Sequence, residues 1–318
     1  MNDIATSLTP QPEPGDPFEH AALPREQLSM PWAMHMPTLE RAADFVRGKW
    51  PDARPRIGLV LGSGWGPVAE SFNIRESLSY TEIPGVGVSK GSDHAGRLLW
   101  AEKAGVETFV FQGRRHWYEG DGWTPVAATP FLSRTFGAEI MLFCNAAGTL
   151  NPEIKPGDIA VITDHINLTG FNPLSGEHHP FWGPRFPDMT DVYSPYLRAV
   201  IQNAGDLSPD LTLKEGVLGI LGGGRAYETP AEVRALRAMG ADLAGMSIGN
   251  GESMLSTSSG MLTAALSCAS NWGAGMGRKK LDHKEVCEQL ALSMSGIIQL
   301  LDNTWNLLAD KPLGFWRS

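Results

Sequence analysis

Short apolar runs and helical patterns alternate along this chain, and that alternation most limits the folds open to it. The segments 56–61 and 140–145 consist almost wholly of apolar residues, which is typical of strands buried on both faces. Helical patterns lie between such runs, so we expect an α/β fold with a largely parallel sheet. Residues 18–318 contain no linker or shift in composition and predict a single domain. Residues 1–17, rich in Pro, Asp, Glu and Ser, predict a mobile tail.

Composition and charge disfavour nucleic-acid binding, a disulfide framework and a zinc site. The 318 residues carry a net charge of -9 and a pI near 5.4, which disfavours nucleic-acid binding in general. The three cysteines are far apart and form no CxxC pair, which favours a reducing compartment over a disulfide framework or a zinc site. We expect a cytoplasmic protein, because the chain has no apolar stretch of about 20 residues and no signal-peptide pattern.

The segment Gln112–Gly120 concentrates charged and aromatic residues directly after an apolar run. If the segment stays extended, its side chains alternate with a period of two, and Gln112, Arg114, His116 and Tyr118 share one face. A guanidinium, an imidazole and a phenol on one face would make an oxyanion or phosphate receptor. An edge strand with ordinary surface charges is the alternative interpretation.

Polar residues also follow several other predicted strands. In sheets with parallel strands, ligands bind at the carboxyl ends of the strands, so such residues are candidates for one site. The candidates are Ser63, Arg114, Asn145, Glu228, Met246, Ser247 and Asn271. The turn Gly62–Gly66 either offers its N–H groups to an anion or is a tight structural turn. Glu177-His178-His179 is interpreted as an exposed loop without metal, because it has no spaced ligand partners.

Local patterns predict several turns and helix ends. Lys103-Ala104-Gly105 between two strand-like runs predicts a hairpin. Thr124 before Pro125 predicts the N-cap of a helix, and Thr229–Glu232 is a capping box. The segment from Asp282 to about Leu308 has the pattern of one long amphipathic helix.

Taken in order, the motifs of the chain resemble those of the trimeric purine nucleoside phosphorylases of the inosine and guanosine type. The resemblance covers about residues 39–308 and includes many motifs in one order, which makes it specific. The matching motifs are Gly62-Ser63-Gly64, His94-Ala95-Gly96, Gln112-Gly113-Arg114, His116, Tyr118-Glu119-Gly120, Asn145-Ala146-Ala147-Gly148, Leu150-Asn151-Pro152, Gly157-Asp158, Asp164-His165-Ile166-Asn167, Arg185-Phe186-Pro187, Tyr227-Glu228-Thr229-Pro230-Ala231-Glu232, Gly245-Met246-Ser247, Asn271 and His283.

The resemblance implies a role for each matching position. The implied phosphate-binding residues are Ser63, His94, Arg114, His116, the Ala146 N–H and Ser247. The implied nucleoside-binding residues are Tyr118, Phe171, Tyr227, Glu228, Met246, Asn271 and His283. Of all these, His116, Glu228 and Asn271 would act in catalysis, and Phe171 would reach into the site of an adjacent subunit.

The resemblance also implies a three-layer α/β/α fold with a mixed, partly barrel-like sheet and a homotrimer. The reaction would be phosphorolysis of purine nucleosides, with inosine and guanosine preferred. Phosphate is already an anionic nucleophile and a co-substrate, so no metal or other cofactor is expected. The chain departs from the family around the base, notably at Arg225, Trp272 and a 248–252 loop that is one residue longer.

Two other functions compete with this interpretation. A methylthioadenosine-type phosphorylase would share the fold, but Asn271 in place of Asp and His283 as a partner for a hydroxyl argue against it. A diverged, non-catalytic nucleoside-binding protein is the alternative from a different class, and the altered 248–252 loop is the feature that supports it.

Overall fold

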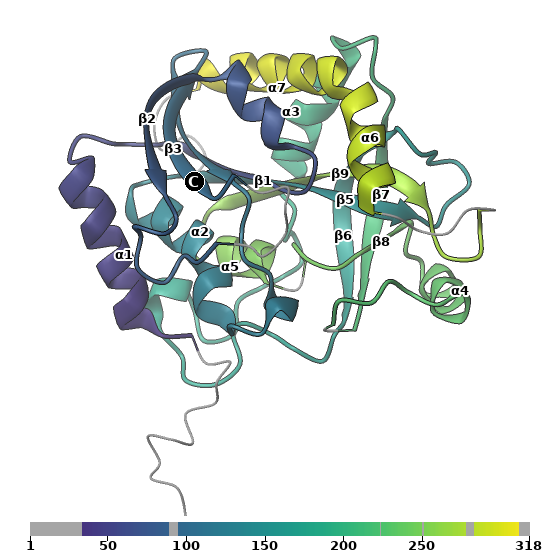
Figure 1. Cartoon of the computed structure of the whole chain (residues 1–318), viewed down its shortest axis with the longest axis horizontal. Helices are drawn as coiled ribbons and strands as arrows, with labels where there is room; N and C mark the ends of the chain where they lie inside the picture. Colours follow the sequence, from purple (N-terminus) through teal and green to yellow (C-terminus); the bar gives the residue numbers. More distant parts are fainter. Residues whose placement is uncertain (1–33, 89–94, 223, 250, 278–282, 312–318) are drawn as a thin grey trace, which may run out of the picture.

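A nine-stranded sheet runs through the middle of the molecule, and helices cover both of its faces (Figure 1). The computed structural model describes residues 34–88, 95–222, 224–249, 251–277 and 283–311. The strands are β1 Ile57–Leu61, β2 Asn73–Ser79, β3 Arg97–Lys103, β4 Val106–Gln112, β5 Ile140–Thr149, β6 Ile159–Leu168, β7 Leu213–Leu221, β8 Leu243–Gly245 and β9 Leu262–Trp272. The α-helices are α1 Met36–Lys49, α2 Trp123–Thr135, α3 Pro195–Asp206, α4 Pro230–Ala238, α5 Glu252–Ser258, α6 His283–Leu292 and α7 Met294–Ala309.

The sheet is mixed and curls back on itself at one side. Its order is β2-β3-β4-β1-β5-β8-β7-β6-β9, and β9 also pairs with β5. Strands β4, β1, β5 and β9 run parallel to one another, whereas β8 runs antiparallel to β5 and β6 runs antiparallel to β9. The three-layer α/β/α fold with a partly barrel-like sheet is therefore confirmed, without full closure into a barrel. The expectation of a largely parallel sheet holds only in part, because five of the nine strand pairings are parallel and four are antiparallel.

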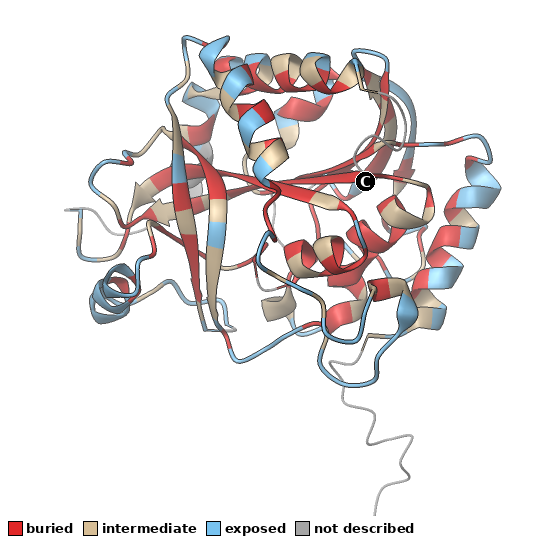
Figure 2. Ribbon diagram, turned by 180° about the vertical axis from the view of Figure 1, so that it is seen from behind, coloured by how far each residue is buried: buried red, intermediate tan, exposed pale blue. Residues whose placement is uncertain are grey.

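Strand β1 shows why the sheet needs helices on both faces. Ile57, Leu59 and Leu61 point into an apolar cluster shared with α3 and α7, and Val60 points into a second cluster with α1, α2 and α5. Figure 1 shows these helix groups on opposite sides of the sheet, and Figure 2 shows the continuous burial of the central strands. Burying one such side chain contributes about 1.5–3 kcal/mol, so both helical layers stabilise the same strands.

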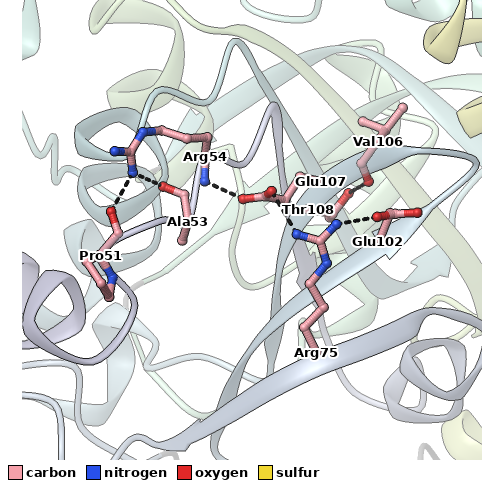
Figure 3. Close-up of polar contacts among 8 residues, drawn as sticks. All are labelled: Pro51, Ala53, Arg54, Arg75, Glu102, Val106, Glu107 and Thr108. Carbon is pink, nitrogen blue, oxygen red and sulfur yellow. Dashed lines mark hydrogen bonds and ion pairs between the residues drawn. The ribbon is translucent and has the colours of Figure 1, made fainter.

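The predicted hairpin is confirmed, and it continues into a strand that the sequence did not reveal. Ala104 and Gly105 have φ values of 50° and 75°, as both central residues of a tight hairpin turn require. Strand β2 adds to β3 at the edge of the sheet, with five exposed residues in succession. Its Arg75 bonds Glu102 and Glu107 on the neighbouring strands (Figure 3). Charges on an edge strand disfavour pairing with another chain.

Two predicted helix ends differ from the structure. Helix α2 begins at Trp123, with Gly122 at its N-cap, because the Thr124 hydroxyl accepts a hydrogen bond from the His35 N–H at 2.8 Å instead of capping the helix. The predicted carboxyl-terminal helix is two helices that meet at Ser293, whose hydroxyl donates to the Gly157 carbonyl at 3.2 Å.

The capping box before α4 is confirmed in both of its hydrogen bonds. The Thr229 hydroxyl accepts from the Glu232 N–H at 3.3 Å, and the Glu232 carboxylate accepts from the Thr229 N–H at 2.7 Å. These bonds satisfy two N–H groups that the helix itself leaves without partners. Glu228 therefore directly precedes a fixed helix start.

Two further expectations concern the extent of the chain. Residues 1–17, predicted to be a mobile tail, lie outside the described residues, and the single domain over 18–318 stays a prediction. None of the helices in the described ranges combines the length and apolar character needed to cross a bilayer.

Candidate active site

One cavity of about 390 Å³ is lined by all seven residues that the sequence placed at or after strand ends, six of them polar. It is also lined by His116, Tyr118, Ala146 and Tyr227, four of the residues assigned by resemblance. The residues come from segments that lie up to about two hundred positions apart in the sequence, so only the tertiary structure brings them together.

One of the strands that carry these segments, β8, does not run in the direction that the sequence analysis expected. Strand β8 is antiparallel to β5, with Gly148 opposite Ala244 and Thr149 opposite Leu243. The chain that leaves β8 therefore turns back beside the middle of β5, which brings Ser247 close to the Asn145 part of the strand. The carboxyl ends of β5 and β8 point in opposite directions, so a shared carboxyl edge accounts for the residues on β1, β4, β5 and β9 but not for Met246 and Ser247 after β8.

The segment after β4 turns and does not stay extended. Gly113 has a φ of 93° and a 3-10 turn begins four residues later, at Trp117, so the predicted extended strand was wrong. Arg114, His116 and Tyr118 nevertheless line the same cavity. Gln112, expected on their face, points elsewhere and donates to the Gly66 carbonyl at 3.3 Å.

Arg114 is a fully buried cation in the wall of this cavity. Its Nε donates to Glu252 Oε1 at 2.6 Å, and its Nη2 donates to Ser247 Oγ at 2.8 Å. Its Nη1 is buried and has no hydrogen-bond partner among the described residues. Gly62 permits the close approach, because a Cβ there would lie 3.1 Å from Nη1 and 2.5 Å from a backbone carbonyl oxygen. A buried donor without a partner is costly, and an anion in the cavity would satisfy it.

His116 and Tyr118 stack on each other with ring centroids 4.9 Å apart and an angle of 13° between the planes. Burial raises the pKa of Tyr118 to about 12, against the opposing effect of Arg114, so the phenol stays a neutral donor. Glu119 Oε1 accepts from the His116 N–H at 2.9 Å, and its Oε2 accepts from Arg115 Nη1 at 2.9 Å. Arg115 is thus a buried ion-pair partner that supports the His116 backbone through Glu119.

The cavity is also lined by an amide, Asn271, and a carboxyl group, Glu228. Asn271 Oδ1 accepts from Ser270 Oγ at 2.7 Å, and its Nδ2 donates to the Trp272 carbonyl at 3.0 Å. The amide nitrogen carries a second hydrogen, which leaves one donor for a ligand. Burial raises the pKa of Glu228 above the usual 4.5, so a ligand that donates to its carboxylate would offset the cost of burying the charge.

Three predicted site residues are not found in this cavity. Phe171 lines a separate cavity of about 530 Å³, is 41% exposed and packs against Trp117 with ring centroids 4.9 Å apart. His94 lies outside the described residues, and His283 begins α6 but its side chain is not described. No grouping of three or more potential metal ligands occurs in the described ranges.

Two charged residues of the site had no role assigned to them in the sequence analysis. Arg225 lines the cavity, and Glu252 forms a buried ion pair with Arg114. Both positions were noticed only as departures from the family pattern or as part of an altered loop. A carboxylate at a helix start five residues after Ser247 was the available signal, but nothing local indicates that it faces an arginine 138 residues away.

Comparison with known proteins identifies the family of this chain. The family model described as "Phosphorylase superfamily" matches residues 56–304. Purine nucleoside phosphorylase 1 of Geobacillus stearothermophilus is 40% identical over 80% of this chain and 92% of its own length. The corresponding protein of Bacillus subtilis is 39% identical over 83% of this chain and 96% of its own length.

A solved structure is similar in fold over nearly the same range. The crystal structure of Schistosoma mansoni purine nucleoside phosphorylase in complex with inosine aligns with a TM-score of 0.78 and 28% identity, over 89% of this chain and 99% of that chain. The chain therefore belongs to the phosphorylase superfamily, and within it to the purine nucleoside phosphorylases.

The raised pKa of Glu228 makes a prediction about stability. The folded protein holds this proton more tightly than the unfolded chain, so stability falls as pH rises from about 4.5, the ordinary pKa, through the raised value. Glu228→Gln removes that loss, so its Tm should exceed the wild-type Tm at pH 7.5, and the difference should shrink toward pH 4.5. Thermal unfolding of the ligand-free protein at several pH values measures this.

The matched control for that comparison is Glu177→Gln, which changes an exposed glutamate in the same way. This variant should melt with the wild type at every pH. A Glu228→Gln protein that is less stable than the wild type at pH 7.5 would show that the carboxylate is stabilised rather than penalised in the cavity.

Proposed function

We propose that this protein catalyses the phosphorolysis of purine nucleosides, and that inosine and guanosine are preferred. The glycosidic bond from the ribose C1′ to the base breaks, a bond from C1′ to a phosphate oxygen forms, and the base leaves with a proton. The observation that carries the proposal is the buried Arg114 Nη1, which lacks a partner in the described structure and lies in the wall of a cavity that Glu228 and Asn271 also line.

We propose that the Arg114 end binds phosphate. Arg114, Ser63 and Ser247 together supply a guanidinium edge and two hydroxyl groups, and His116 adds an imidazole. Arginine binds phosphate with two parallel hydrogen bonds, and such bonds are strong where water is excluded. The resemblance adds the Ala146 N–H and His94 to this set. The phosphate so held is itself the nucleophile, and the reaction we propose therefore needs no cofactor.

The opposite end is proposed to hold the purine. As the C1′ bond breaks, the sugar gains positive charge that the phosphate dianion offsets, and the purine gains negative charge around N7 and its 6-oxygen. The remaining amide hydrogen of Asn271 can donate to that region. Above its raised pKa, the Glu228 carboxylate can accept a hydrogen bond from the purine N1–H. Tyr227 would stack on the base, and Tyr118, Met246 and His283 would contact the ribose.

We also propose a homotrimer in which Phe171 completes the site of a neighbouring subunit. Phe171 is too exposed to be a core residue, and it packs on Trp117, which itself stacks on Trp123 with ring centroids 4.2 Å apart. A rigid aromatic surface of this kind is typical of protein interfaces. A cytoplasmic location is proposed from the free thiols of Cys144 and Cys268, both of which are buried.

Replacement of Arg114 tests the phosphate end. Arg114→Ala removes a charge-assisted contact worth about 2 kcal/mol or more, so the KM for phosphate should rise by about thirty-fold. Arg114→Lys keeps the charge but loses the paired donors of the guanidinium, so its KM for phosphate should lie between those of the wild type and Arg114→Ala. The assay is release of hypoxanthine from inosine with and without phosphate. Unchanged phosphate saturation in Arg114→Ala would place the anion elsewhere, and release without phosphate would indicate a hydrolase.

Replacement of Asn271 tests the base end. An amide can both donate and accept, whereas an ionised Asp only accepts and suits a 6-amino group. A mismatched pattern leaves a buried group unpaired at a cost of about 1–3 kcal/mol, so wild type should favour inosine over adenosine by about ten- to a hundred-fold. Asn271→Asp should shrink or reverse that ratio of kcat/KM values. Equal kcat/KM values for both nucleosides in the wild type would contradict the assignment and leave the phosphate site intact.

Replacement of Phe171 tests the subunit arrangement. Phe171→Ala should raise the KM for the nucleoside by about ten-fold, because a buried aromatic contact is lost at the site of the neighbour. Leu207→Ala, a substitution of an exposed residue at the end of α3, is the control and should leave this KM unchanged. Steady-state kinetics measure the KM for the nucleoside, and light scattering measures the oligomeric state. A fully active monomer at nanomolar concentration would rule out the shared site.

A further inference from the structure

Glu252, the first residue of α5, binds two separate parts of the cavity wall with its two carboxylate oxygens. Oε1 accepts from Arg114 Nε at 2.6 Å, and Oε2 accepts from the Ile248 N–H at 3.2 Å. Arg114 follows β4, and Ile248 directly follows Ser247 in the loop after β8. The carboxylate is 2% exposed, so solvent does not compete for these contacts.

The contact with Glu252 determines which edge of the guanidinium faces the cavity. Nε is occupied by the carboxylate and Nη2 by Ser247, whereas Nη1 has no partner in the described structure. The guanidinium is planar, so a carboxylate fixed at Nε leaves the edge formed by Nη1 and Nη2 for a second anion. Without that carboxylate, the side chain could rotate and present other donors.

The same carboxylate holds a backbone conformation that is otherwise unfavourable. Ile248 is buried and has a φ of 80°, which is a rare and strained value for a β-branched residue. Its N–H is bound by Glu252 Oε2, and its carbonyl accepts from the Ser253 N–H at 3.1 Å. Ser247 precedes this residue, so the position of its hydroxyl depends on the same turn.

We propose that Glu252 is a positioning residue that joins Arg114 and Ser247 into one phosphate receptor. It sets the rotation of the guanidinium, fixes the turn that presents the Ser247 hydroxyl, and neutralises a buried cation while the cavity holds no phosphate. A buried arginine without a counterion is strongly destabilising, so a permanent partner on its far side keeps the site formed between turnovers. The proposal rests on the proposed function, because it requires phosphate at Arg114.

Two substitutions at position 252 separate positioning from mere packing. Glu252→Gln has the same size, and its oxygen can still accept from Arg114 Nε, but its NH₂ group cannot accept from the Ile248 N–H. Glu252→Ala loses both contacts. We expect the KM for phosphate to rise by about five-fold in the glutamine variant and more than twenty-fold in the alanine variant. The KM for inosine should stay within about two-fold of wild type in both. If the alanine variant does not fold, the glutamine variant decides the outcome.

A matched control is available at the opposite end of the same strands. Glu139, just before β5, is also a buried glutamate, and its Oε2 lies 3.7 Å from Arg56 Nη2. Glu139→Gln should lower the Tm as a buried ion pair is weakened, but it should leave the KM for phosphate unchanged. A rise in the KM for phosphate in both glutamine variants would overturn the proposal, because it would then reflect general destabilisation.

Steady-state assays with inosine and varied phosphate, together with the shift in Tm that added phosphate causes, supply the measurements. A reduced phosphate-induced shift in Glu252→Gln, with a normal shift in Glu139→Gln, is the expected result. A wild-type KM for phosphate in Glu252→Gln would overturn the positioning role while phosphorolysis stands. Phosphate-independent cleavage by the wild type would overturn the proposed function, and this inference with it.

Discussion

Strand β5 pairs with β9 along its whole length, but on its other edge it pairs first with β1 and then with β8. Residues 145–147 lie between these two pairings, and they line the cavity. Because β8 runs against β5, the loop after β8 turns back toward this gap, and the loop after β1 reaches it from the other side. The change of partner along one strand therefore both curls the sheet and creates the site (Figure 1).

The fold must also accommodate a buried positive charge. Arg114 lies at the cavity wall with almost no exposure, and taking a guanidinium out of water costs several kcal/mol unless partners surround it. Those partners come from the start of α5 and the loop after β8, while Gly62 gives the room for its approach. The arginine can bind a substrate anion strongly for the same reason that it needs a permanent counterion, namely the absence of competing water.

Local patterns predicted those parts of the fold that local physics controls. The apolar run of β1, the hairpin turn at Ala104 and the capping box at Thr229 are confirmed, because each depends on residues within a few positions of one another. Strand β2 was missed because its residues are exposed and charged, and its strand hydrogen bonds depend on pairing with β3. The break at Ser293 was missed because its hydroxyl bonds the carbonyl of Gly157, far away in the sequence.

The sequence by itself determined the chemistry of the site: an arginine, a histidine, serines, an amide and a carboxylate in an order that resembles one enzyme family. It could not determine how these groups meet, since the extended segment was wrong and the shared carboxyl edge holds for β1, β4, β5 and β9 but not for β8. The tertiary structure decided that Asn145 and Ser247 face the same cavity from strands of opposite direction, and that Glu252 supports Arg114 from 138 residues away. Strand direction and long-range ion pairs depend on which segments pack together, and no local pattern records that.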